Sequence, residues 1–219
     1  MAKAPPATLG PGDDAVQALL VRYRCHVPFH AVRARFLGNI ASPAMATSPI
    51  DTVRQLWGGE LPVFDDLDGA NALMGALVMG LWNRLTRHQE RSTPFRLVRP
   101  NLPADREGLA HLARIRREEL DGFVDGLFGT LEELDLPERA HRAVRTLSEL
   151  RAMFAGVEDL TGDLSKPASA TDISVTARQI RELTKVAEHE MHEAVLSCTR
   201  ARRQTLAALT MAKPTCTEF

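Results

Sequence analysis

The 219-residue sequence has little of what marks a secreted or a nucleic-acid-binding protein. Its three cysteines, Cys25, Cys198 and Cys216, are odd in number, and no two stand in a C-x-x-C spacing. A disulfide framework is therefore not expected, and a reducing, cytoplasmic location is predicted. Aromatic residues make up 5% of the chain, with one tyrosine, which leaves few rings to stack on nucleic-acid bases. The net charge of -1 gives no overall field that would attract nucleic acid or anionic lipid.

A hydrophobic run long enough for a membrane span is also missing. The uncharged stretch GANALMGALVMGLW covers residues 69–82, whereas a spanning helix needs about 20 residues, and Arg84 follows closely. The stretch holds leucine, methionine and alanine but no proline, so it is predicted to be helical. Its apolar residues occupy most sides of that helix. We therefore expect a central helix, sealed among other helices of an α-helical domain.

Apolar residues recur at helical spacing along the chain, and no segment shows the alternation typical of a β-strand. The predicted fold class is all-α, a helical bundle with a long C-terminal amphipathic helix. The longest irregular segment is 90–108, ERSTPFRLVRPNLPADREG, which is expected to connect two helical halves. Helices of the bundle are expected at about 13–24, 30–41, 48–57, 69–82, 105–134 and 137–154, and a break of the fifth within the glycine-containing stretch 122–129 is left open. The predicted division is a flexible leader without a signal peptide (1–12), an all-α domain (13–161), a linker (162–171), the long helix (172–211) and a flexible tail (212–219).

The last helix carries an apolar stripe at three-to-four spacing and a charged face opposite to it. A helix of about 40 residues is long for a globular protein, so we expect it to dock on the domain or on a second copy of the chain. The residues of the stripe predicted to bind a partner are Ile173, Ile180, Leu183 and Met191.

Histidines offer weak candidates for a metal site. CHVPFH places His26 and His30 beside Cys25, and EHEMHE places His189 and His192 on the charged face of the last helix. A zinc site needs three or four such ligands, and neither segment supplies a second pair nearby. EHEMHE also fails the H-E-x-x-H metalloprotease pattern because its histidines are three residues apart. We expect no metal or cofactor, and we interpret EHEMHE as a solvated charged face.

No catalytic motif is present: the chain has no phosphate-binding glycine loop, no dinucleotide fingerprint and no G-x-S-x-G elbow. DDLDG at 65–69 does not fit a calcium loop, and Asp66 or Asp68 is instead expected to cap the helix that follows. Two rows of arginines could contact phosphates, but acidic neighbours make mostly solvated faces with local ion pairs the better interpretation. These rows are Arg139, Arg142 and Arg145, and Arg114, Arg116 and Arg117.

Four segments within residues 30–130, FLGNIASP, SPIDTVRQLWGG, LMGALVMGLWNRL and LDGFVDGLFG, resemble the bacterial YecA/YgfB-like family of uncharacterised proteins. The resemblance covers a little under half of the chain. It implies an all-α bundle and no settled biochemical activity. Some members carry a cysteine-rich, zinc-binding tail, which has no counterpart in TMAKPTCTEF at the end of this chain. The residues that match the family's structural motif are Gly38, Pro43, Trp57, Trp82, Asn83, Gly122, Phe123 and Gly126.

The leading hypothesis is a cytoplasmic, non-enzymatic helical protein with a regulatory role that acts through protein–protein interaction. Its partner would be an unknown protein or a second copy, bound through the C-terminal helix. One alternative is a metal-binding helical protein or a metal-dependent enzyme that uses the histidines. A second, ranked lower, is regulatory association with nucleic acid through the arginine rows. No membrane partner is expected.

Overall fold

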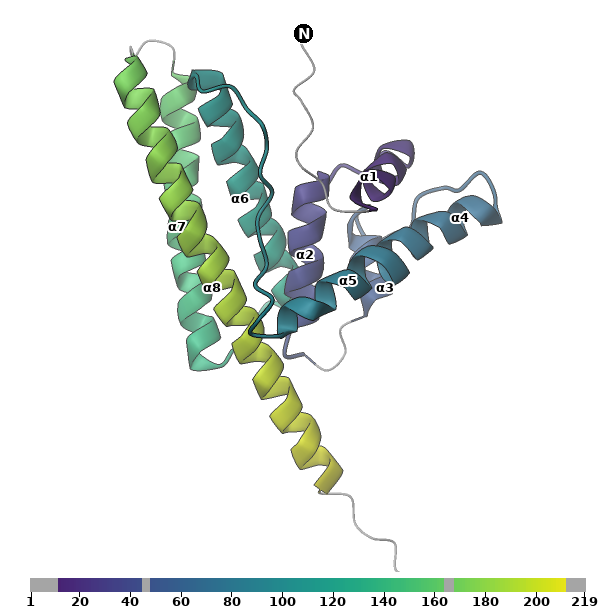
Figure 1. Cartoon of the computed structure of the whole chain (residues 1–219). Coiled ribbons are helices and arrows are strands. Elements are labelled where there is room, and N and C mark those ends of the chain that lie inside the picture. Colours follow the sequence, from purple (N-terminus) through teal and green to yellow (C-terminus); the bar gives the residue numbers. More distant parts are fainter. Residues whose placement is uncertain (1–11, 45–47, 164–167, 212–219) are drawn as a thin grey trace, which may run out of the picture.

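The computed structural model describes residues 12–44, 48–163 and 168–211, and all regular structure in these ranges is helical (Figure 1). This confirms the all-α class and the long C-terminal helix. The predicted leader up to residue 11, residues 164–167 of the predicted linker and the predicted tail from 212 lie outside the described residues. The first helices are α1 (Asp13–Arg22), α2 (Phe29–Ala41), α3 (Pro49–Gln55) and α4 (Leu67–Met74). After α4 come a π-helical stretch (Gly75–Trp82), α5 (Asn83–Leu85), a 3₁₀ turn (Thr86–Gln89), α6 (Arg106–Phe128), α7 (Glu138–Gly162) and α8 (Ala170–Met211).

Local sequence signals explain where several of these helices begin and end. The Asp66 carboxylate accepts the backbone N–H of Gly69 at 2.7 Å, which confirms that DDLDG supplies a helix cap. Asp105 caps α6 in the same way, through the N–H of Gly108 at 2.8 Å. α6 stops at Phe128, within the stretch where a break was left open, and does not continue to residue 134. Gly129 follows it with φ of 61°, a left-handed conformation that ends the helix.

The expectation that the segment around Trp82 is sealed in the centre is wrong. Only every fourth residue along this helix is fully buried, Trp82 itself is half-buried, and the side chain of Met79 is 71% exposed. The central helix is α2, of whose thirteen residues all but three are buried. Apolar residues on every side of this helix predicted that the whole helix would be buried. They do not determine its burial, because its outer face is exposed to solvent. The inward-facing residues are Leu73, Leu77, Leu81 and Leu85.

α2 is central because its backbone lies directly against that of α6. A Cβ atom on Gly122 of α6 would lie 2.6 Å from the carbonyl oxygen of Ala31, and one on Gly126 would overlap with that of Arg35. On the opposite side of the contact, a Cβ on Gly38 would overlap with the carbonyl oxygen of Phe123. Three glycines therefore let the two helices approach more closely than any side chain would permit.

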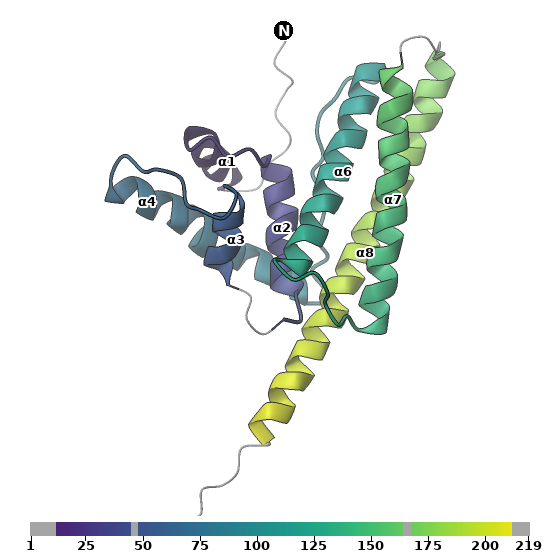
Figure 2. The same ribbon diagram turned by 180° about the vertical axis from the view of Figure 1, so that it is seen from behind.

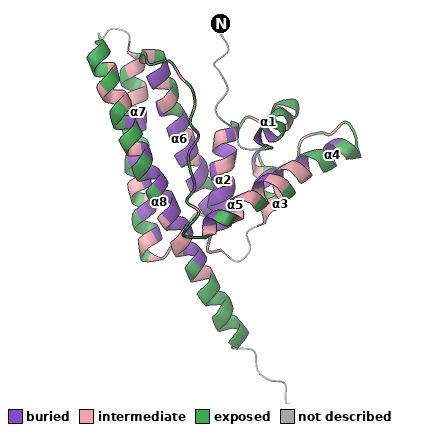
Figure 3. Ribbon diagram, viewed as in Figure 1, coloured by how far each residue is buried: buried purple, intermediate pink, exposed green. Residues whose placement is uncertain are grey.

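α7 and α8 complete the body by packing alongside α6, with α8 also touching α2 (Figures 1 and 2). Phe154 of α7 and Met191 of α8 are fully buried in this layer. The inner face of α8 is buried in the middle of the helix, whereas the helix after Arg202 is exposed on all sides (Figure 3). The docking of α8 on its own domain is thus intramolecular up to Arg202.

The glycine contact predicts a specific sensitivity to substitution. We expect Gly126→Ala to lower the free energy of unfolding by about 2 kcal/mol, because the added methyl group meets a backbone oxygen that cannot move aside. Chemical denaturation followed by circular dichroism measures the change.

Gly156→Ala in α7 is the matched control, since nothing lies within 4 Å of the position of its Cβ. There the loss of helix-interior glycine should raise the free energy of unfolding by roughly 0.5–1 kcal/mol. Equal effects at the two positions would contradict the close contact between α2 and α6.

Candidate functional site

Residues 90–105 form an extended strap that links the 3₁₀ turn after α5 to the start of α6 (Figure 1). Its middle lies against the helices, with the side chains of Phe95, Leu97 and Val98 buried and those of Arg96 and Arg99 exposed. An extended backbone without a neighbouring strand leaves its N–H and C=O groups in need of partners. The side chains of the surrounding helices supply these partners.

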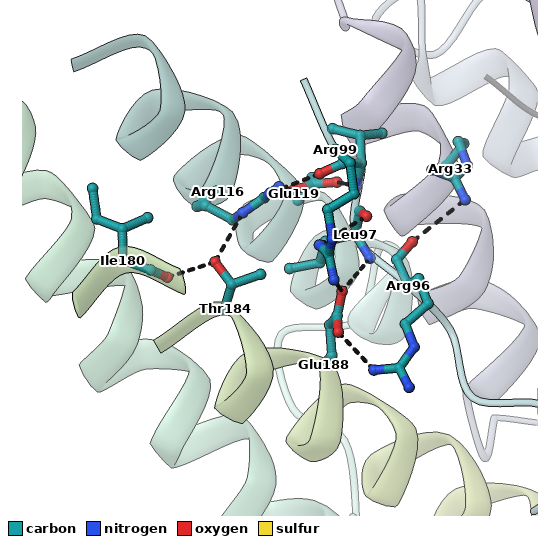
Figure 4. Close-up of polar contacts among 10 residues, drawn as sticks. Arg33, Arg96, Leu97, Arg99, Arg116, Glu119, Ile180, Thr184 and Glu188 are labelled. Carbon is teal, nitrogen blue, oxygen red and sulfur yellow. Dashed lines mark hydrogen bonds and ion pairs between the residues drawn. The ribbon is translucent and has the colours of Figure 1, made fainter. Parts of the chain in front are cut away.

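Two buried carboxylates hold successive N–H groups of the strap (Figure 4). Glu188 of α8 accepts the N–H of Leu97 at 2.9 Å, and Glu119 of α6 accepts the N–H of Val98 at 2.8 Å. Arg116 of α6 donates to the carbonyl oxygen of Val98 at 2.6 Å. The strap is thereby fixed to α6 and α8 through its backbone.

Arginines balance the charge of both carboxylates, which would be costly to bury alone. Glu188 pairs with Arg96 at 2.8 Å and with Arg99 at 2.6 Å, both from the strap. Glu119 pairs with Arg116, whose Nε also donates to Thr184 of α8 at 3.1 Å (Figure 4). Burial raises the pKa of Glu119, while Arg116 and the N–H of Val98 act against that rise.

This network corrects two sequence-based interpretations. EHEMHE was expected to be a solvated face, but Glu188 and His192 are buried and only His189 is exposed. The Arg116 side chain was placed on a solvated face, and it is buried too. Both predictions failed because the strap, which covers these residues, is remote in sequence and has no periodic signal of its own.

The last turns of α8, residues 203–211, project beyond the body as an arm (Figures 1 and 2). At about 100° per residue, Met191, Val195, Cys198, Leu206 and Leu209 lie within a sector of roughly 80°. The first three are buried in the core, whereas Leu206 is 44% and Leu209 58% exposed. The apolar stripe of α8 therefore continues past the point where the body ends.

Arg202 makes the last hydrogen bonds between α8 and the body. Its guanidinium donates to the carbonyl oxygens of Ile40 at 3.0 Å and Ser42 at 3.2 Å, and to the Gln89 side chain at 3.1 Å. These two carbonyls belong to the C-terminal end of α2, where a cation is favourable. Beyond this anchor every residue from 203 to 211 is exposed.

The residues predicted to bind a partner lie largely inside the protein. Ile180 and Met191 belong to the core, and Ile173 and Leu183 are half-buried against it. The exposed part of the stripe is Leu206 and Leu209, which sequence reasoning did not single out. Their helical spacing was visible in the sequence, but nothing there marks Arg202 as the end of the body.

The structure does not bring the four candidate histidines together. His26 and His189 are exposed, and His30 Nε2 lies 2.7 Å from the carboxylate of Glu118. Burial lowers the pKa of His30 against the opposing pull of Glu118. His192 Nε2 lies 3.4 Å from the Arg91 carbonyl oxygen. Among the described residues no group of three or more histidine, cysteine or acidic side chains could hold a metal ion.

Cys25, which lies beside these histidines in sequence, is not poised as a nucleophile or a ligand. Its Sγ contacts the carbonyl oxygens of Val27 and Leu56, each at 3.6 Å. Burial raises the pKa of the Cys25 thiol, so the thiolate that attacks substrates or binds metals is disfavoured.

The arginine rows are largely neutralised within the chain. Arg139 pairs with Glu190 at 2.6 Å, and Glu158 pairs with Arg114 at 2.7 Å and Arg117 at 3.1 Å. Arg142 and Arg145 form longer pairs with acids on their own helix. A row of paired arginines offers little free charge to a phosphate backbone.

Most of the residues that match the motif of the YecA/YgfB-like family make contacts that hold helices together. Gly38, Gly122 and Gly126 lie at the contact of α2 with α6, where Phe123 is fully buried. The Trp57 indole donates to the carbonyl oxygen of Tyr23 at 2.8 Å and joins α3 to the end of α1.

The other three motif residues are more peripheral. The half-buried Trp82 packs edge-on against Phe36, with ring centroids 5.7 Å apart. Pro43 follows the end of α2, and Asn83 is exposed. None of the eight motif residues lies on the arm.

Two cavities lie near the end of the body from which the arm emerges. One, of about 660 Å³, borders the base of the arm and is lined by Arg91, Arg139, Arg200 and Arg203 together with Glu90 and Glu193. The other, of about 540 Å³, lies at the turn between α6 and α7 and is called the α6–α7 cavity below. Its lining is Phe128, Glu132, Glu133, Leu134, Asp135, Leu136, His141, Val144 and Arg145.

Comparison with models of known protein families, with curated proteins and with solved structures found no match for this chain. Within the described residues, no helix combines the length and the apolar character needed to cross a bilayer. Among the strap, the cavities and the arm, the most distinctive feature of the molecule is the exposed arm of α8.

The strap network makes a prediction about stability. We expect Glu188→Ala to lower the free energy of unfolding by about 2–4 kcal/mol, because it leaves the buried N–H of Leu97 without an acceptor and two arginines without their shared carboxylate. Urea denaturation gives the free energy, and hydrogen exchange at the Leu97 amide reports release of the strap.

Glu182→Ala on the same helix is the control. Its carboxylate pairs only with Lys185, and both side chains are more than 60% exposed. This loss should cost less than about 1 kcal/mol. If Glu188→Ala were no more harmful than Glu182→Ala, the strap would not depend on the buried carboxylate.

Proposed function

We propose that this is a protein-binding protein, without catalytic activity of its own, whose interaction element is the arm of α8. The observation that carries the proposal is the continuation of the buried stripe of α8 onto Leu206 and Leu209, which are exposed. An amphipathic helix with an uncovered apolar face is a common element of protein recognition. We propose a regulatory role for this binding.

The isolation of the arm supports this role. Helices shorter than about 12 residues are marginal in water when they stand alone. The arm persists as a helix because it continues α8, which the body holds through Arg202. It therefore offers a preformed helical surface, with Met211 at its tip 88% exposed.

The alternatives receive less support from the described residues. A metal-dependent function would need histidines that converge, and His26, His30, His189 and His192 do not. Nucleic-acid binding through the arginine rows would need free positive charge, and these rows are paired with acids.

Two further parts of the proposal rest on the sequence. Membership of the YecA/YgfB-like family is proposed from the matched segments and agrees with the role of Gly38, Gly122 and Gly126 in the contact of α2 with α6. A cytoplasmic location is proposed from the cysteine pattern.

Site-specific photo-crosslinking tests the arm directly. A photo-reactive amino acid in place of Leu209, in cells that express the full chain, should give a discrete crosslinked product. Leu206→Glu in the same protein should reduce that product about tenfold or more, because burying a charge in place of a leucine costs the interface well over 1.4 kcal/mol. Denaturing electrophoresis and mass spectrometry measure the yield and identify the product.

Lys185, exposed on the part of α8 that packs on the body, is the control position for the photo-reactive group. It should give no discrete product. The helix content of the Leu206→Glu variant, measured by circular dichroism, should match that of the unsubstituted protein, because Leu206 is 44% exposed and lies outside the core. Indistinguishable products at positions 185 and 209 would contradict the proposed role of the arm.

A further inference from the structure

We propose that the α6–α7 cavity is the docking site for the arm of a second copy of this chain, so that two copies exchange arms. The inference rests on the proposed function, because it takes the arm to be a binding element and names its partner. It assigns a role to two of the open surfaces at this end of the body, the exposed apolar helix and the concave apolar surface of the α6–α7 cavity.

Charge makes the two surfaces complementary. Residues 200–211 contain Arg200, Arg202 and Arg203 and no acidic residue. The rim of the α6–α7 cavity carries Glu132, Glu133 and Asp135, which are exposed and form no ion pair with another described residue. Arg200 and Arg203 are likewise exposed and without an ion-pair partner in the described chain. Opposite charges on two such surfaces favour and orient their association.

The apolar side chains of the cavity and of the arm are also complementary. Phe128, Leu134, Leu136 and Val144 line the cavity, and Leu131 beside it is 46% exposed. Leucines of a docked arm would meet these side chains, while the arginines at the base of the arm would meet the acidic rim. An apolar centre with a charged border is the usual arrangement of a protein interface.

The placement of the two surfaces suits a two-fold arrangement. The turn between α6 and α7 and the base of the arm lie at the same end of the body in both views (Figures 1 and 2). A two-fold axis near this end lets each arm reach the cavity of the other copy, so one contact is made twice. The arm does not fill the cavity of its own chain, since its leucines are exposed and α8 carries them away from the body.

Charge reversal tests the pairing. The cavity variant is Glu132→Arg/Glu133→Arg/Asp135→Arg, and the arm variant is Arg200→Glu/Arg203→Glu, both in the full chain. The unsubstituted protein should have twice the chain mass of 24.1 kDa by size exclusion with light scattering. Each variant alone should dissociate with a dissociation constant at least tenfold higher, because like charges then face each other at both contacts.

An equimolar mixture of the two variants distinguishes this pairing from general loss of association. In the mixed dimer the basic arm of the cavity variant meets the acidic rim of the arm variant, and the reversed arm meets the reversed rim. Both contacts are restored, so the mixture should regain the mass of a dimer. Arg178→Glu/Arg181→Glu, at exposed positions near the start of α8, is the charge-matched control and should leave the dimer unchanged. Circular dichroism verifies that every variant keeps its helix content.

Two results would overturn the inference. One is an unsubstituted protein that stays monomeric at every accessible concentration, and the other is a mixture that stays monomeric although each variant is folded. If Leu209 then still crosslinked to a different protein, the arm would keep its proposed function and only the second copy would be excluded as its partner. If position 209 gave no product at all, the proposed function itself would fail.

Discussion

The fold depends on two buried glutamates that hold an extended backbone against the helices. Glu119 and Glu188 come from different helices and accept adjacent N–H groups of the strap, in the place where a neighbouring strand would otherwise serve. Because buried carboxylates are costly without partners, the arginines beside them are part of the same constraint. Through this network the strap fixes α6 and α8 to each other and to the helices that precede it.

The direction of α8 follows from this constraint, and the candidate interface follows from that direction. Glu188 and Thr184 place the middle of the helix against the strap and α6, while Arg202 fixes it at the end of α2. The stripe of α8 thus has two parts: its middle part completes the core, and its last part, with Leu206 and Leu209, is exposed. Under the proposed function, one amphipathic pattern serves both stability and recognition.

Features with a local signal were predictable from the sequence: the helices themselves, the cap at Asp66, the irregular segment after residue 90 and the amphipathic α8. Features that depend on distant contacts were not. Hydrophobicity favoured the segment around Trp82 as the centre, whereas α2 is central because glycines such as Gly126 admit its backbone. Glu188 was interpreted as solvated because no periodicity reveals that a strap covers it. The exposed site was missed because the stripe runs on without a break at Arg202.

The length of α8 beyond its last anchor has a thermodynamic consequence for any partner. From Arg202 to Met211 the helix overhangs the body by about 14 Å, at 1.5 Å per residue. A helical extension this short, anchored at its base, keeps its helical conformation and its direction in the unbound protein. Because the arm becomes ordered during folding, its association does not cost the conformational entropy that a disordered tail would lose. A larger share of the contact energy therefore contributes to affinity.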